Sequence, residues 1–250
     1  MTQLETLQKM IDNSNKIVFF GGAGVSTESG IPDFRSETGL FRAVEEYGMP
    51  PELIVNHNFF MMRTKSFFQY YKKNLIYTQA KPNKAHIALA QLEKRGKLLA
   101  VITQNIDGLH QMAGSKSVYE LHGSIHRNYC MQCKKEFDVA YIMQPEHNQK
   151  NDVYGIPICD VCGNVIKPDV VLYEEPLKEE VMESAQKAIS QADLLLVGGT
   201  SLVVYPAAGM LQYYKGKDIV LINKSQTQYD TKASLIIHEP IGEVLGALQI

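Results

Sequence analysis

The chain contains four cysteines, and all of them fall into two CxxC pairs, Cys130/Cys133 and Cys159/Cys162. A CxxC pair supplies two thiolates from one tight turn, and tetrahedral zinc needs four that converge at about 2.3 Å. The 25 residues between the pairs, 134–158, exceed the usual ribbon spacing of about 15–20 residues, which is compatible with a small ribbon lobe that carries a loop. Two disulfides or free buried thiols are the alternatives. Four thiolates leave no open coordination position, so we expect a structural zinc ion and chemistry elsewhere.

Composition narrows the class of protein. The 250 residues are 45% hydrophobic and 21% charged, and the net charge of −2 gives no electrostatic case for binding nucleic acid or an anionic membrane. No apolar run approaches the roughly 20 residues that span a bilayer. Residues 1–14 lack the apolar centre of a signal peptide. We therefore expect a cytoplasmic protein, and a reducing cytoplasm favours metal thiolates over disulfides.

Apolar runs alternate with helical patterns along the chain. Strands are predicted at 16–20, 98–103, 118–121, 192–197, 218–222 and 234–237, and helices at 3–14 and 83–95. Continuous apolar strands separated by helices predict a parallel sheet covered on both faces. Residues 41–80 predict a helical insertion, because they are rich in Phe, Tyr and Met without strand alternation, and residues 126–165 carry the cysteines. The prediction is a doubly wound α/β domain, made of 1–40, 81–125 and 166–250, with both insertions packed as a smaller lobe.

Glycine or polar residues follow four of the predicted strands. These are Gly22-Ala23-Gly24, Gln104-Asn105-Ile106-Asp107, Gly199-Thr200-Ser201 and Asn223. Ligands of open parallel sheets bind outside the carboxyl ends of the strands, so these residues predict the site. The first group predicts a phosphate-binding turn that opens a helix. A tight structural turn is the alternative, because the third glycine and the acidic residue of the common dinucleotide fingerprint are missing.

Two further segments carry candidate chemistry. Residues 29–35 form a predicted rigid turn that could close over a nucleotide, and 103–110 place amide, carboxylate and imidazole groups after a strand. A polar turn with self-satisfied side chains is the alternative for 103–110. His122 follows the short apolar strand 118–121. It is the candidate general base, because imidazole titrates near neutrality; the other six histidines are interpreted as structural.

Several of these motifs together resemble those of one family. Segments 22–26, 30–35, 103–107 and 121–123, both CxxC pairs, and segments 167–171 and 199–202 occur in the order seen in sirtuins. The likeness covers nearly the whole chain and is closest to bacterial NAD-dependent protein-lysine deacylases. It implies a Rossmann-like NAD-binding domain with a zinc-ribbon and helical lobe. It also implies acetylated or otherwise acylated protein lysines as partners.

In sirtuins NAD is a consumed co-substrate rather than a hydride carrier. Nicotinamide leaves, the acyl oxygen of the modified lysine attacks the ribose, and free lysine and O-acyl-ADP-ribose result. By resemblance, His122 is the general base for a ribose hydroxyl, and Asn105 positions ribose and water. The residues implied in NAD binding are Gly22, Ala23, Gly24, Ser26, Thr27, Phe34, Arg35, Gln104, Ile106, Asp107, Gly199, Thr200, Ser201 and Asn223. Val170, Val171 and Leu172 would pair with the substrate backbone.

Two departures from the family pattern bear on the substrate. Sirtuins commonly show an aromatic residue, glycine and glutamate where this chain has Tyr173-Glu174-Glu175. The carboxylate of Glu174 could narrow the cleft or favour basic residues beside the target lysine. Desuccinylating sirtuins use a Tyr and Arg pair, whereas 68–73 contain tyrosines and lysines but no arginine. Lysine can pair with a carboxylate but lacks the bidentate fork, so acetyl and other neutral acyl groups are expected.

Other functions remain open at this point. The same NAD site could transfer ADP-ribose to a protein, or the chain could be a non-catalytic NAD-sensing module. An NAD dehydrogenase is disfavoured by the absent third glycine and acidic ribose ligand.

Overall fold

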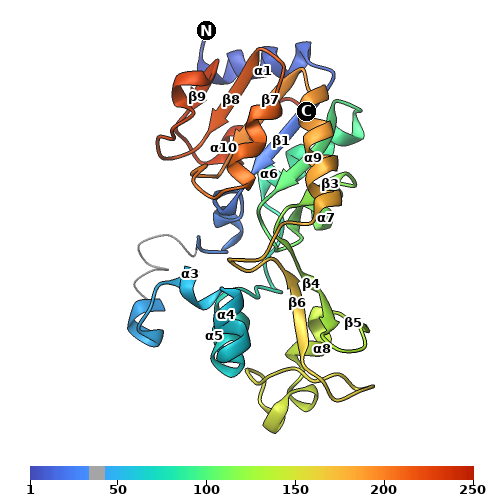
Figure 1. Ribbon diagram of the computed structural model, residues 1–250. Coiled ribbons are helices and arrows are strands. Elements are labelled where there is room, and N and C mark those ends of the chain that lie inside the picture. The colour runs from blue at the N-terminus through green and yellow to red at the C-terminus, as the bar shows by residue number, and fades with distance from the viewer. Residues whose placement is uncertain (34–42) are drawn as a thin grey trace.

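The computed structural model describes residues 1–33 and 43–250, which form a large and a small lobe (Figure 1). The large lobe contains a six-stranded parallel sheet with the order β3-β2-β1-β7-β8-β9. Its strands are β1 (Ile17–Gly21), β2 (Leu98–Thr103), β3 (Val118–Glu120), β7 (Leu194–Gly198), β8 (Asp218–Ile222) and β9 (Leu235–Ile237). Both chain ends lie on this lobe.

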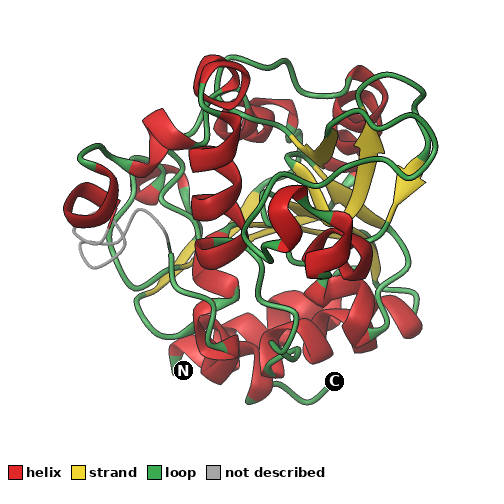
Figure 2. Cartoon of the chain, turned by 90° about the horizontal axis from the view of Figure 1, so that it is seen from below, coloured by secondary structure: helices red, strands yellow, loops and turns green. Residues whose placement is uncertain are grey.

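Helices cover both faces of the large sheet, as the prediction of a doubly wound domain requires. Ile17 and Phe19 of β1 pack into the core beneath one set of helices, whereas Val18 and Phe20 pack into the core on the opposite face. The first set is α1 (Gln3–Asn13), α6 (Lys84–Lys94) and α10 (Ile241–Gly246), and the second is α9 (Glu179–Gln191) and η5 (Ala207–Tyr213). Seen from below, the helices lie around the strands (Figure 2). The predicted fold class is confirmed.

Two helices of the first set, α1 and α6, begin at polar capping residues. Thr2 and Glu5 form a capping box at the start of α1. Asn83 caps α6 by accepting from the Ala85 amide at 2.9 Å. Its side-chain amide also donates to the Val25 carbonyl at 2.7 Å. The cap of α6 therefore holds the loop that follows β1.

That loop differs from the predicted phosphate-binding helix start. Residues after β1 form two short 3₁₀ helices, η1 (Ala23–Val25) and η2 (Thr27–Ser29), rather than an α-helix. The Gly24 amide donates to the Gly199 carbonyl at 2.8 Å, and a Cβ on Gly24 would lie 2.7 Å from the Gly199 Cα. Asn83 engages the Val25 carbonyl, which a continuing α-helix would use internally. Tertiary contacts therefore set this turn at the point where the strand order reverses, between β1 and β7.

The small lobe combines helices with a three-stranded antiparallel sheet of order β5-β4-β6. Its elements are α3 (Pro51–Ile54), α4 (His57–Met62), α5 (Thr64–Asn74), β4 (Gly123–Cys130), β5 (Glu136–Phe137), α8 (Val139–Met143), η3 (Pro145–His147), η4 (Gln149–Asn151) and β6 (Ile166–Val170). The sheet thus starts before and ends after the predicted insertion 126–165, whose domain boundaries stay a prediction. The remaining elements are α7 (Leu109–Ala113) and η6 (Asp230–Lys232). Within 1–33 and 43–250, every helix is too short or too polar to cross a bilayer.

Candidate active site

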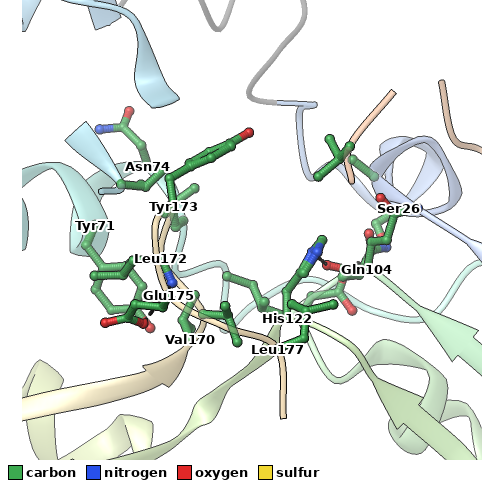
Figure 3. A pocket seen from close by; sticks show the side chains of 18 of the residues that line it. Ser26, Tyr71, Asn74, Gln104, His122, Val170, Leu172, Tyr173, Glu175 and Leu177 are labelled. Atoms are coloured by element: carbon green, nitrogen blue, oxygen red, sulfur yellow. Dashed lines mark hydrogen bonds between the residues drawn. The ribbon is translucent and has the colours of Figure 1, made fainter. Parts of the chain in front are cut away.

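A cavity of about 230 Å³ lies between the two lobes. Figure 3 shows Ser26, Gln104 and His122 at one end and Tyr71, Asn74 and Tyr173 at the other. Among the predicted site residues, those that line the cavity are Ala23, Ser26, Gln104, Asn105, Ile106, Asp107, His122, Val170, Val171 and Leu172. Segments far apart in the sequence therefore meet at the carboxyl ends of β1, β2 and β3.

His122 lies two residues beyond the end of β3, and the backbone holds it from both lobes. The Leu121 amide donates to Thr103 O at 2.9 Å, and the Val171 amide donates to His122 O at 3.0 Å. The ring Nδ1 lies 2.9 Å from Gln104 O. A carbonyl oxygen only accepts, so Nδ1 carries the proton, and Nε2 of the neutral ring carries the lone pair. This is the tautomer that a general base at Nε2 requires.

Beside His122, three polar side chains form a hydrogen-bonded group. The Asn105 amide donates to Ser26 Oγ at 3.0 Å, and Ser26 Oγ donates to Asp107 Oδ2 at 2.6 Å. The other carboxylate oxygen of Asp107 accepts from the Leu109 amide at 2.9 Å. These bonds fix the orientations of an amide, a hydroxyl and a carboxylate on the cavity wall. The alternative of a polar turn accounts for the Leu109 bond but not for the contacts to the β1 loop.

The remaining predicted NAD residues do not line the cavity. Gln104 Nε2 donates to Thr200 Oγ1 at 3.0 Å, which links the ends of β2 and β7. The Asn223 side chain instead donates to Ser225 O at 2.8 Å. The predicted residues outside the cavity wall are Gly22, Gly24, Thr27, Gly199, Thr200, Ser201 and Asn223. Phe34 and Arg35 lie outside the described residues.

The four cysteine sulfurs converge in the small lobe. All four lie within 4.8 Å of one another, with Cys130–Cys162 at 3.3 Å and Cys133–Cys159 at 3.6 Å. Ligands about 2.3 Å from a tetrahedral centre lie about 3.8 Å apart, whereas a disulfide would be about 2.05 Å long. None of the four cysteines forms a disulfide. The cluster can therefore bind a zinc ion, and the disulfide alternative is wrong.

Comparisons with known proteins agree on one family. The model of the Sir2 family, the sirtuins, matches residues 22–206, which is most of the chain. The chain belongs to the Sir2 family. It is 58% identical over 245 residues to an NAD-dependent protein deacetylase of Clostridium perfringens, covering 98% of this chain and 97% of that protein. A deacetylase of the same name from Clostridium acetobutylicum is 56% identical with the same coverage.

Solved Sir2 structures share the whole architecture. One, a Sir2 complex with a p53 peptide and NAD⁺, has a TM-score of 0.83 at 37% identity and covers 98% of this chain and 96% of its own. Another contains a deacetylated p53 peptide and 3′-O-acetyl-ADP-ribose, with a TM-score of 0.86 at 36% identity over the same shares. The resemblance found in the sequence is thus confirmed.

Several cavity residues of this Sir2 protein were missed in the sequence. They are Val55, Tyr71, Asn74, Leu75, Tyr77, Leu177, Val204, Tyr205 and Pro206, besides the segment 173–175 noted for its departure from the family. Ile31 and Pro32 also line the cavity, and they belong to the predicted rigid turn. The aromatic content of 41–80 predicted a helical insertion. The spacing of these aromatic residues does not show that Tyr71 lines the cavity while its aromatic neighbours lie only in the core.

The sequence left open that a lysine in 68–73 binds the carboxylate of an acidic acyl group, but Lys72 is held elsewhere. Its ammonium group donates to Ile142 O, Asn148 Oδ1, Val153 O and Gly155 O at 2.7–3.0 Å, and the residue is 2% exposed. Burial lowers the pKa of Lys72 to about 7 against the opposing charge of Asp152. Lys73 instead pairs with Glu46 at 2.6 Å. The possibility that either lysine receives an acidic acyl tail is therefore not supported, because both are engaged elsewhere.

Two buried histidines, one on α6 and one on α7, lie against each other. His86 and His110 have ring centroids 4.6 Å apart and are 0% and 1% exposed. Among the described residues, both ring nitrogens of His110 and Nε2 of His86 lack hydrogen-bond partners. Burial lowers the pKa of His86 to about 4 and that of His110 well below its ordinary value. Both rings are therefore neutral in the folded protein near pH 7.

This pair predicts a loss of stability in mild acid. Below about pH 6.5 the unfolded chain binds protons that the folded chain cannot, which costs about 1.4 kcal/mol per pH unit for each histidine. Stability is thus full above pH 6.5 and falls toward pH 4. We expect urea unfolding at pH 5.5 to give a free energy about 2–3 kcal/mol below that at pH 7.5. His110→Phe should reduce this loss by about half, whereas the exposed control His238→Gln should leave it unchanged; equal losses in all three proteins would contradict the account.

Proposed function

We propose that this chain is an NAD-dependent protein-lysine deacylase that favours acetyl groups and releases nicotinamide and O-acyl-ADP-ribose. The observation that carries the proposal is the 2.9 Å distance between His122 Nδ1 and Gln104 O on the wall of the interlobe cavity, because it assigns the proton to Nδ1. The names of the relatives and the ligands of the Sir2 structures support the same activity. The proposal includes cytoplasmic residence, which four cysteines outside any disulfide support.

The residues of the large lobe suit a dinucleotide. The close contact between Gly24 and Gly199 brings the loops after β1 and β7 together at the carboxyl edge of the sheet, where open parallel sheets bind ligands, so we assign the phosphates and adenosine to Gly22–Gly24, Thr27, Gly199–Ser201 and Asn223. Phe34 and Arg35 remain proposed NAD residues on sequence grounds. Gln104, Asn105, Ser26, Ile106 and Asp107 would surround the nicotinamide ribose. Bound NAD supplies an electrophilic ribose carbon when nicotinamide leaves.

His122 has a defined part in this scheme. Its Nε2 takes a proton from a ribose hydroxyl, and that hydroxyl then attacks the carbon of the acyl group. The Gln104 carbonyl keeps the ring oriented and stabilises the imidazolium that forms, because it accepts from Nδ1 throughout. Asn105 is held toward Ser26 and would position the ribose and the water that releases the lysine product.

The substrate would enter from the side of segment 170–175. We assign the substrate backbone to Val170, Val171 and Leu172 by strand addition. The amides of Val171 and Leu172 already donate within the protein, to His122 O and to Glu175. Pairing would therefore rely on carbonyl oxygens of this segment, and it carries little sequence information.

Neutral acyl groups should be strongly preferred. The described wall of the cavity contains no lysine or arginine, and Lys72 is held inside the small lobe. A succinyl carboxylate would lose its water without gaining a cation, which costs at least several kcal/mol. On one peptide sequence, we expect kcat/KM for acetyl-lysine to exceed that for succinyl-lysine by about 100-fold or more. Comparable rates for both peptides would contradict the assignment.

The reaction products distinguish deacylation from protein ADP-ribosylation, the main alternative function. Incubation with NAD and an acetylated peptide should release nicotinamide only when the peptide is present. ADP-ribosyl transfer would instead leave label from adenine-labelled NAD on protein. A non-catalytic NAD-sensing module would release no nicotinamide in either case.

A further inference from the structure

The rim of the cavity carries an acidic side chain that the proposed chemistry does not use. Glu174 lines the cavity and is exposed. Its backbone has a φ of +74°, in the left-handed region that glycine adopts most readily. By the resemblance noted in the sequence, sirtuins commonly have glycine at this position. A strained position is therefore occupied by a charged residue in this chain.

The segment that carries Glu174 is anchored to the small lobe. The Tyr173 amide donates to Val55 O at 3.0 Å, and the His57 amide donates to Tyr173 O at 3.0 Å. One carboxylate oxygen of Glu174 accepts from the Asn58 side chain at 2.5 Å. The carboxylate thus has a fixed place between the cavity and α4, rather than a freely moving one.

The charge of Glu174 is also not compensated by its surroundings. The neighbouring Glu175 contacts Lys167 at 3.0 Å and His57 at 2.9 Å. Glu174 has only the neutral Asn58 as a partner within 1–33 and 43–250. The rim beside the expected path of the substrate therefore carries a net negative charge that a peptide cation can meet.

From these observations we infer that Glu174 selects acylated lysines that have an arginine or lysine close by in the substrate chain. This inference rests on the proposed deacylase function and adds to it a preference for basic sequence context. The peptide backbone provides little sequence discrimination, so a single rim carboxylate can dominate the choice. An exposed ion pair of this kind gives an expected gain of about two- to fivefold in kcat/KM.

The test uses acetyl-lysine peptides that differ only in Ala, Arg or Glu at each of the two positions before and after the target. The wild type should favour Arg over Ala by about two- to fivefold at one or more positions, and should disfavour Glu. Raising the salt from about 0.05 M to 0.5 M should weaken the preference, because ions screen exposed charges. Glu174→Gln keeps an acceptor for Asn58 and should abolish the preference, while the rate on the Ala peptide stays within about twofold.

Glu183→Gln is the matched control, because it removes one exposed carboxylate on α9, away from the cavity wall. It should retain the wild-type preference. An active wild type that treats Arg, Ala and Glu peptides alike, or a Glu174→Gln enzyme that still prefers Arg, would overturn the inference. Absence of deacetylation on every peptide would instead refute the proposed function itself.

Discussion

Replacing His122 with alanine should lower kcat for deacetylation by about 100- to 10,000-fold, the usual contribution of a general base. The loss follows from geometry, because Gln104 O lies 2.9 Å from Nδ1 and holds the proton there, so that the lone pair needed for proton abstraction is on Nε2. Nicotinamide release should fall less than O-acyl-ADP-ribose formation, since the base acts after that bond breaks. Parallel assays of both products on one acetylated peptide measure the difference.

The control for this variant is His147→Ala, which removes a histidine stacked on Tyr141 in the small lobe. It should keep most of the activity. Both variants should melt within a few degrees of the parent, because neither side chain belongs to the buried core. A His122→Ala enzyme within tenfold of the parent would rule out the assigned role.

Removal of zinc should unfold the small lobe and abolish activity, although the metal takes no part in the chemistry. Structural zinc contributes about 10–16 kcal/mol in small domains, which matches or exceeds the total stability of about 5–15 kcal/mol of a typical protein. Cys130 and Cys159 are buried in the same core cluster as Tyr71, Val170 and Leu172. Loss of the cluster therefore disturbs one wall of the cavity.

This prediction is measured by metal analysis, limited proteolysis and activity on the same sample. The purified protein should contain one zinc per chain. After chelation, proteases should cut within 134–158, and added zinc but not magnesium should restore resistance and activity. A chelated, metal-free protein with full activity and an unchanged melting curve would contradict the structural role.

The buried strands could be predicted from sequence because their apolar character is local. Leu98–Thr103 and Asp218–Ile222 have the predicted bounds, and the other large-sheet strands differ by one or two residues. Asn105 and His122, each two residues beyond such a strand, line the cavity as expected, since the ends of parallel strands meet at one edge, while their chemical roles stay predictions.

Features that depend on distant contacts could not be predicted. The loop after β1 forms 3₁₀ turns because Gly24 bonds Gly199 and Asn83 bonds Val25, two contacts between segments far apart in the chain. The sequence places Lys72 in the helical insertion and allows it to pair with a carboxylate, yet four oxygens of the zinc-binding insertion enclose its ammonium group. Periodicity reports which face of a helix is apolar, but not which polar cavity a long side chain enters.

In the proposed reaction the acyl group leaves lysine for the ribose of NAD. Mass spectrometry of a complete reaction with NAD and an acetyl-lysine peptide tests it most directly. We expect equal amounts of nicotinamide, deacetylated peptide and O-acetyl-ADP-ribose. Deacetylated peptide formed with free acetate and with NAD left intact would contradict it.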